Sequence, residues 1–356
     1  MVTATIGKSD NNFLKNATRF VPKVNSRRCV HAVIGIASCV NCVKACPHQA
    51  WQLSDESLTL DTKACTGCAL CVAACPEAAI EYDYQPQLRE YQKHNAAFFA
   101  CEKINDKNIK PTIPCLHAVG LYELLRLYQH GVRLLITASS NCETCDYAAR
   151  PGLKTTVKLL NKMLESSAQE KIKHLEQDTK KFGKWLNSLK STGQRNDRRG
   201  FLKNMLASGA KAGLPVRKKT GLSVFSLAEL IPGSTDSDSI LPFIPQIDDK
   251  LCNVCGACIK VCTHQALALD QEQHEFKLTP KACTGCMICV DICDENAINI
   301  RKWQKPETLQ MELDSNKCKS CGVEFYSPKA GQTNAEYCHI CSVRNKNSNL
   351  YQIVDV

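Results

Sequence analysis

Cysteine is the residue type in this chain that most clearly carries chemistry. Twenty-four cysteines occur among 356 residues, and most of them stand in C-x2-C units. The N-terminal stretch up to Phe20 has no apolar core of the kind that directs export, so we expect a reducing compartment. In such a compartment, closely repeated C-x2-C units bind metal rather than form disulfides. The sequence therefore predicts a cytoplasmic, metal-loaded protein.

The strongest signal is the spacing C-x2-C-x2-C-x3-C, which occurs in three complete runs. The runs are Cys65-Cys68-Cys71-Cys75, Cys252-Cys255-Cys258-Cys262 and Cys283-Cys286-Cys289-Cys293. This spacing wraps three thiolates around one face of an iron–sulfur cube, and the fourth cysteine reaches the neighbouring cluster. A further run, Cys39-Cys42-Cys46, has Ile36 where its first cysteine would stand. Two runs in tandem predict one closed unit with two clusters.

The chain resembles the bacterial-type 2[4Fe–4S] ferredoxins twice, over roughly residues 29–84 and 247–301, and KACTGC recurs in both copies. We call the two copies the first module and the second module. The resemblance implies four cubane clusters, each with three cysteines from one run and one from the other. The implied ligand sets are Cys252, Cys255, Cys258 and Cys293; Cys283, Cys286, Cys289 and Cys262; Cys65, Cys68, Cys71 and Cys46; and Cys29, Cys39, Cys42 and Cys75.

The last of these sets depends on Cys29, which lies ten residues before Cys39. In this interpretation Cys29 replaces the missing first cysteine through a longer loop. Two alternatives stay open: a site with three cysteines that holds a [3Fe–4S] cluster, and ligation by His31. An imidazole in place of a thiolate would raise the reduction potential.

Four more cysteines lie between the modules. Cys101 follows the apolar run Ala96–Ala100, and Cys142 and Cys145 follow the strand-like run Val132–Ala138. Cys115 precedes a segment with apolar residues at helical spacing. Cysteines at the ends of successive α/β elements are expected to meet at one edge of a sheet, where such folds bind cofactors.

The segment PCLHAVGLYELLRLYQHGVRLLITASSNCETCDYA resembles the small iron–sulfur subunit associated with hydrogenase and heterodisulfide reductase. That resemblance implies a [2Fe–2S] cluster held by Cys101, Cys115, Cys142 and Cys145, and a flavin-containing redox partner. Three other interpretations stay open. Cys142 and Cys145 alone form a redox dithiol, Cys101 and Cys115 are buried as small hydrophobic residues, or His117 and Cys115 form a nucleophilic pair.

The last four cysteines form two C-x2-C knuckles that are sixteen residues apart. They are Cys318, Cys321, Cys338 and Cys341. This spacing resembles a zinc ribbon, in which four thiolates close a structural Zn²⁺ site. A rubredoxin-type iron site is the alternative.

The elements that position these residues predict an α+β multidomain protein. Two ferredoxin-like double-cubane modules flank a small α/β domain, and a zinc-ribbon-like segment follows. The predicted parts are an N-terminal tail (1–28), the first module (29–86), a central domain with a long helical segment (87–190), a linker (191–246), the second module (247–304) and a tail (305–356). No run is apolar for long enough to span a membrane.

The formal net charge of +10 is offset by the predicted clusters, because each site with four thiolates carries a net negative charge. The segment 190–219 holds nine Lys or Arg and one acid, and we interpret it as a solvated basic connector. It leaves open contact with a partner or a membrane surface, but nucleic acid is not expected. We therefore predict an electron-transfer subunit of an oxidoreductase that passes single electrons to or from partner proteins and has no catalytic residues of its own. The alternatives are a redox enzyme that uses the central cysteines on a disulfide or sulfur substrate, and a nucleic-acid-binding iron–sulfur protein.

Overall fold

The protein is described from a computed structural model. It describes residues 21–54, 58–82, 86–104, 106, 108–145, 147, 152–189, 227–232, 239–330 and 336–346. Most of the predicted linker, with its basic segment, lies outside the described residues. Contacts divide the chain into two compact units, one with the described residues of 1–32 and 40–234 and the other with those of 33–39 and 235–356.

The first and second modules share one order of elements: strand, helix, strand, strand, helix, strand. The first module contains β1 (Lys23–Val24), η1 (Val30–Ala32), α1 (Asn41–Ala45), β2 (Trp51–Leu53), β3 (Leu58–Leu60), α2 (Leu70–Ala74) and β4 (Ile80–Glu81). The second contains β9 (Leu241–Ile247), α8 (Ala257–Val261), β10 (Leu267–Asp270), β11 (Glu275–Leu278), η4 (Pro280–Ala282), α9 (Ile288–Asp291) and β12 (Ile298–Gln304). Between the two cysteine runs of each module lies an antiparallel hairpin, β2–β3 in the first and β10–β11 in the second.

An antiparallel strand pair joins the beginning of each module to its end. β1 pairs with β4, and β9 pairs with β12. β9 begins at Leu241, inside the range that the sequence assigned to the linker. Pro242 and Pro245 obscure the strand pattern there, because proline is tolerated only where no ladder hydrogen bond is needed from its nitrogen.

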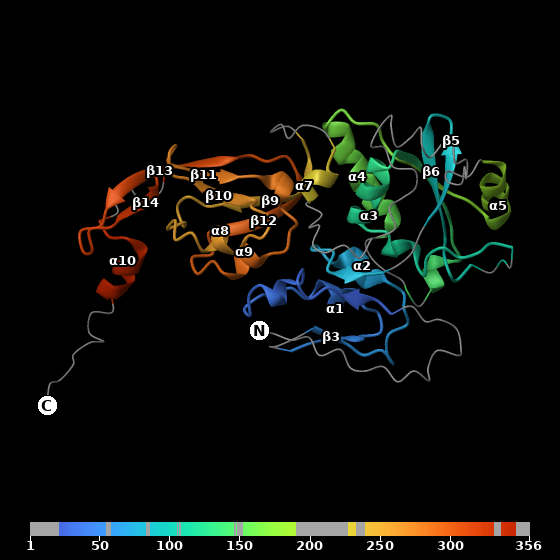
Figure 1. The fold of residues 1–356 in the computed structure, drawn as a ribbon, viewed down its shortest axis with the longest axis horizontal. Helices are drawn as coiled ribbons and strands as arrows, with labels where there is room; N and C mark the ends of the chain where they lie inside the picture. The colour runs from blue at the N-terminus through green and yellow to red at the C-terminus, as the bar shows by residue number, and fades with distance from the viewer. Residues whose placement is uncertain are drawn as a thin grey trace, which may run out of the picture. The chain divides into compact units, whose positions relative to one another are not determined.

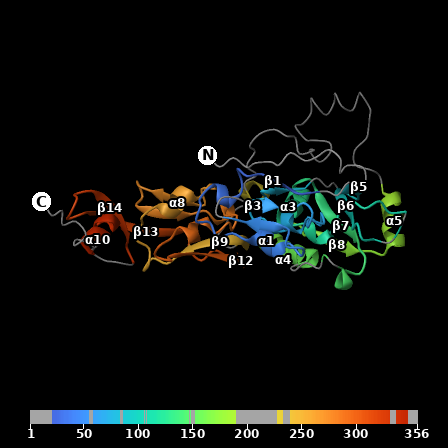
Figure 2. The ribbon, with the colours of Figure 1, turned by 90° about the horizontal axis from the view of Figure 1, so that it is seen from below.

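The central domain is built on a four-stranded sheet in the order β5-β6-β7-β8. Its strands are β5 (Gln87–Tyr91), β6 (His94–Ala100), β7 (Val132–Ala138) and β8 (Lys173–Glu176). β6, β7 and β8 are parallel, whereas β5 is antiparallel to β6. Figure 2 shows the four strands next to one another. The two apolar runs predicted as strands form β6 and β7, and Ala96–Ala100 are all fully buried. Burial on both faces is expected of parallel strands that helices cover.

Helices lie on both sides of this sheet. They are α3 (Leu121–Gln129), α4 (Leu153–Ser166) and α5 (Thr179–Ser188), with the short turns η2 (Leu116–Ala118) and η3 (Cys142–Thr144) and the one-turn helix α7 (Leu227–Leu230). Figure 1 shows α3 and α4 on one side of the strands and α5 on the other. Instead of the one long helical segment that the sequence predicts in the central domain, the structure has α4, strand β8 and α5. Asp178 starts α5, because its carboxylate accepts the N–H of Lys181 at 2.9 Å.

The tail continues the sheet of the second module. It contains β13 (Gln310–Lys317), β14 (Glu324–Pro328) and α10 (His339–Lys346). β11 pairs with β13, so the sheet order is β10-β11-β13-β14 across the boundary that the sequence placed after residue 304 (Figure 1). Leu313 of β13 and Tyr326 of β14 pack in one apolar core with Phe276 of β11.

Candidate metal centres

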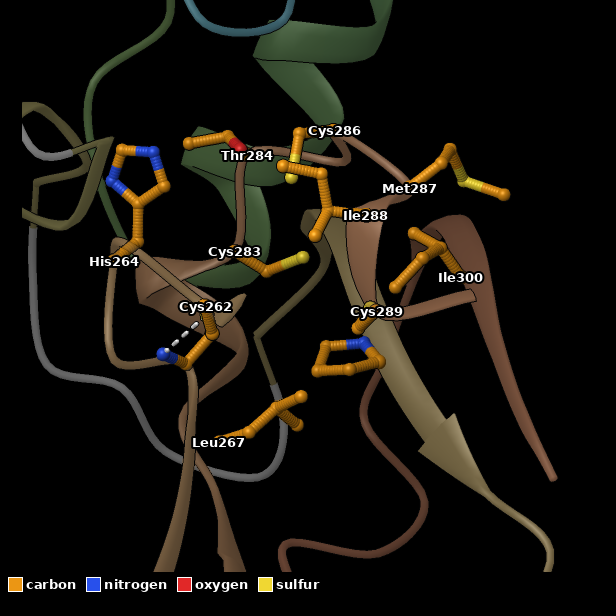
Figure 3. Close-up of a pocket in the computed structure, with 12 residues that line it drawn as sticks. Cys262, His264, Leu267, Cys283, Thr284, Cys286, Met287, Ile288, Cys289 and Ile300 are labelled. Atoms are coloured by element: carbon orange, nitrogen blue, oxygen red, sulfur yellow. Dashed lines mark hydrogen bonds between the residues drawn. The ribbon is translucent and has the colours of Figure 1, made fainter. Parts of the chain in front are cut away.

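Four cysteines of the second module line one pocket. They are Cys262, Cys283, Cys286 and Cys289, which the ferredoxin resemblance assigns to one cluster (Figure 3). Most of the remaining wall is apolar, with Pro245, Leu267, Ile288 and Ile300. Four thiols around an apolar hollow fit a [4Fe–4S] cluster, which four cysteine thiolates hold and whose potential depends on its exposure to solvent.

Left-handed backbone shapes the three complete cysteine runs. The residues directly before and after the second cysteine of each run have positive φ. These pairs are Gly67 and Ala69, Val254 and Gly256, and Gly285 and Met287. The chain thus turns sharply on both sides of the second cysteine of each run. In the last run, the first three cysteines, Cys283, Cys286 and Cys289, line one pocket. The incomplete run departs from this pattern, because Val40, which follows Cys39, has a φ of −124°.

The fourth cysteine of every run accepts a backbone hydrogen bond at its sulfur. The donor is the N–H of an alanine four residues later. The pairs are Ala50 to Cys46 at 3.3 Å, Ala79 to Cys75 at 3.2 Å, Ala266 to Cys262 at 3.3 Å and Ala297 to Cys293 at 3.3 Å. Figure 3 shows the bond to Cys262 as a dashed line. Such N–H donors stabilise thiolate sulfur and tune the potential of a cluster.

Cys29 occupies the same place in the first module that Cys252 occupies in the second. The N–H of Asn25 donates to the carbonyl of Ala79 at 2.7 Å, and the N–H of Asp248 donates to that of Ala297 at 2.7 Å. Cys29 and Cys252 each follow four residues after these donors. The backbone thus supports Cys29 as the replacement for the missing cysteine, with a longer loop between it and Cys39.

Burial keeps several of these thiols neutral while no metal is bound. It raises the pKa of Cys71 and that of Cys258 to about 12, and it also raises the pKa of Cys289. A thiol with so high a pKa is protonated at neutral pH. Ligation therefore displaces protons, and the positive charge of iron is what stabilises the buried thiolates.

The structure brings the four central cysteines together. Cys101 follows β6, while Cys142 and Cys145 follow β7, so all three lie at the carboxyl edge of a parallel strand pair. Burial raises the pKa of Cys101, and the nearby Cys142 and Cys145 add smaller contributions. Burial also raises the pKa of Cys115 to about 12, with smaller contributions from Cys101, Cys145 and Cys68. The predicted convergence at one sheet edge therefore occurs.

His117 has a structural partner that argues against a nucleophilic pair with Cys115. Its Nδ1 accepts the N–H of Leu153 at 3.1 Å, at the beginning of α4. Burial also lowers the pKa of the His117 imidazole. The histidine thus joins the segment after Cys115 to α4 through a ring nitrogen that a general base would need.

The tail cysteines are close enough to hold a single metal ion. The sulfurs of Cys318, Cys321, Cys338 and Cys341 all lie within 4.8 Å of one another, and those of Cys321 and Cys338 are 3.9 Å apart. Four thiolates at about 2.3 Å from one Zn²⁺ lie about 3.8 Å apart in a tetrahedron. The backbone N–H of Cys321 holds the pKa of the Cys318 thiol down to about 6, which favours the thiolate. Among the described residues, this is the one group of cysteines that meets the spacing.

Three residues near these sites were not singled out from the sequence. Phe243 of β9 lies against Gly285, where an added Cβ would come 2.2 Å from the ring. Gly120 lies against Ala73 of α2, and Tyr147 packs among cysteines of the first module and the central domain. Each contact joins segments that are far apart in the chain, so no local sequence pattern reveals it.

Comparison with known families shows what the cysteine runs are. Three models of a 4Fe-4S dicluster domain match the chain, over residues 37–80, 244–294 and 282–323. The chain carries ferredoxin-type [4Fe–4S] modules. A search of the curated proteins finds no match. The third match extends beyond the second ferredoxin module to Cys318 and Cys321, which the structure groups with Cys338 and Cys341 instead.

These ferredoxin modules show an iron–sulfur protein of the electron-transfer type. When bound, the clusters accept and release single electrons, and the chain supplies the thiolates, the sulfur hydrogen bonds and the apolar walls. In the part of the chain that the structure describes, no helix has both the length and the apolar character that crossing a bilayer requires.

Proposed function

We propose that the protein is a multi-centre electron carrier with four [4Fe–4S] clusters, one central [2Fe–2S] cluster and one structural zinc ion. It passes single electrons to or from a partner oxidoreductase in a reducing, cytoplasmic environment and catalyses no reaction alone. The ligand sets are those that the sequence predicts, with Cys29 completing the first module.

The backbone hydrogen bond to the fourth cysteine of each run carries this proposal. In both runs of both ferredoxin modules, the N–H of an alanine four residues after the fourth cysteine donates to its sulfur, although the first run lacks its usual first cysteine. Because the fourth cysteine of a run serves the neighbouring cluster, the site that lacks its usual first cysteine takes Cys75, whose sulfur accepts the N–H of Ala79 at 3.2 Å. Cys29 would supply the missing thiolate, because its backbone position matches that of Cys252 in the second module. With Cys29, the two modules offer four cubane sites.

The central cysteines support the fifth centre. They meet at the carboxyl edge of parallel strands, close enough that, in addition to burial, Cys142 and Cys145 raise the pKa of Cys101, and Cys101 and Cys145 raise that of Cys115. Four cysteines complete a cluster of two irons, in which each iron takes two thiolates. The resemblance to the small subunit associated with hydrogenase and heterodisulfide reductase supports a flavin-containing partner for this site.

Metal analysis of anaerobically purified protein tests the proposal. We expect about 18 iron, 18 acid-labile sulfide and one zinc per chain. The matched variant Cys101→Ala should lose about two iron and two sulfide while it keeps the zinc.

Other metal contents would overturn particular parts. About 16 iron and 16 sulfide with four alkylatable central thiols would remove the [2Fe–2S] site and favour a redox enzyme that uses those thiols. Iron in place of zinc would make the tail a rubredoxin-type site. Binding to nucleic acid with a steep dependence on salt would favour the third function, whose basic segment lies outside the described residues.

A further inference from the structure

One cysteine of the first ferredoxin module packs directly against the central cysteine site. Cys68, Leu70, Cys115 and Tyr147 are all buried and form one apolar cluster, and Cys145 packs against it. Cys68 belongs to the predicted cubane site with Cys46, Cys65 and Cys71. Cys115 and Cys145 belong to the central site. The two sites therefore share a wall that is made partly of their own ligands.

A glycine holds this wall together. Gly120 follows η2, and a Cβ at this position would lie 2.8 Å from the Cα of Ala73 and 3.0 Å from its Cβ. Ala73 lies in α2, between the cysteines of the first module. The φ of Gly120 is −86°, which any residue adopts, so close approach rather than backbone conformation requires glycine here.

Tyr147 contacts residues from both sites. The ring of His48 meets it edge-on with centroids 6.1 Å apart, and the Nζ of Lys103 lies 4.7 Å from its centroid. His48 stands two residues after Cys46, and Lys103 stands two residues after Cys101. Tyr147 is only 7% exposed, so its ring excludes water from the wall.

The other predicted site of the first module contributes no ligand to this wall. Its ligands Cys42 and Cys75 pack with Trp51 and Ile80 in a core that also holds Cys46 and Cys71 of the Cys68 site, and no residue of the central domain belongs to that core. The two cubane sites of the module thus differ in their access to the central cysteines.

We propose that the central four cysteines and the site of Cys46, Cys65, Cys68 and Cys71 form one fixed pair of redox centres. Cys68 and Cys115 place the two centres in contact, and Gly120 and Tyr147 are positioning residues that keep them there. Electrons then reach the central site from this cubane site and not from the other one of the module. In each event one electron leaves the reduced centre and enters the oxidised one, and no bond is made or broken. The inference rests on the proposed [2Fe–2S] site.

Magnetic coupling between the two centres tests this pairing directly. In full-length protein reduced with dithionite, the EPR signal of the [2Fe–2S] centre should relax faster than that of an isolated [2Fe–2S] cluster, because a paramagnetic cubane lies next to it. We call this difference the relaxation enhancement. Gly120→Ala, which separates α2 from the segment after Cys115, should reduce this relaxation enhancement while iron and sulfide contents stay unchanged. Gly183→Ala is the matched control, because Gly183 lies in α5 with open space around its Cα.

Every outcome bears on the pairing. Full iron content without relaxation enhancement in the wild-type protein would overturn it and leave the proposed function intact. An unchanged enhancement in Gly120→Ala would overturn the role of the wall. If Gly120→Ala fails to load its clusters, Tyr147→Ala provides the same comparison. Absence of any [2Fe–2S] signal, with about 16 iron, would overturn the central site itself and this inference with it.

Discussion

Cys29 is the single residue on which the count of four cubane sites depends. We expect Cys29→Ala to lose at least one iron and up to about four, because the cluster that shares Cys39, Cys42 and Cys75 loses a thiolate. The equivalent backbone positions of Cys29 and Cys252 are the physical reason. Iron and sulfide analysis, with EPR for a [3Fe–4S] signal, measures the change.

His31→Ala is the control for this test, because His31 lies on η1 only two residues away. It should leave the iron content and the spectrum unchanged. Full iron in Cys29→Ala together with loss in His31→Ala would assign the ligand to the imidazole instead.

Substitutions at two glycines of the second module distinguish two reasons for glycine, a left-handed backbone and a lack of space for a side chain. Gly256 and Gly285 have φ of +76° and +75°, but only at Gly285 would a Cβ collide with Phe243, at 2.2 Å. Gly256→Ala should cost about 1 kcal/mol of stability, the usual price of a left-handed alanine. Gly285→Ala should cost more and should lower the cluster content of the module, because the ring of Phe243 must move away from the backbone between Cys283 and Cys286. Thermal unfolding and iron analysis of both variants check this, and equal losses would show that the contact with Phe243 is unimportant.

At the scale of elements, the tail strands should protect the clusters of the second module. Leu313 of β13 and Tyr326 of β14 pack in the same core as Cys258 and Cys289. Cys338→Ser removes one thiolate of the proposed zinc site, and we expect the hairpin β13–β14 to loosen and the neighbouring clusters to degrade faster in air. Alkylation followed by peptide mass spectrometry should show Cys258 and Cys289 reacting earlier than in the wild-type protein.

The first module provides the internal control for that experiment. Cys68 and Cys71 lie in the other unit, so their alkylation should keep its wild-type rate. Equal acceleration in both modules would mean that Cys338→Ser acts through general instability and not through the shared sheet.

The sequence predicts some elements better than others for physical reasons. β6 and β7 follow from apolar runs, because those strands are buried along most of their length. α3 follows from apolar residues at helical spacing, because the helix buries one face through Leu124, Leu125 and Tyr128. β8 has only four residues, Lys173–Glu176, and two of them are exposed, so it has no apolar signal. Cysteine spacing predicts the three ligands that one run supplies, because these lie close together along the chain, whereas the fourth ligand follows from the ferredoxin resemblance. The contacts of Gly120, Tyr147 and Phe243 depend on packing between distant segments, which spacing does not encode.

At the scale of the whole molecule, loading with metal should nearly cancel the charge. The formal net charge is +10 when the cysteines are counted as neutral. Four cubanes, one [2Fe–2S] cluster and one zinc, each with four thiolates, would lower it by about 12. Anaerobic isoelectric focusing should therefore show a much lower isoelectric point for the metal-loaded protein than for the metal-free protein. Coincident bands would contradict the proposed metal content.

The closing strand pairs also determine when each module becomes complete during translation. Lys23 pairs with Glu81, and Leu241 pairs with Gln304, so the first strand of a module has no partner until its last strand leaves the ribosome. Until then the emerging chain carries thiols that lack half of their predicted neighbours. The cellular proteins that deliver iron and sulfide would therefore meet the complete first module well before the complete second module. We expect clusters to be loaded in two steps, one for each module, rather than one cluster at a time.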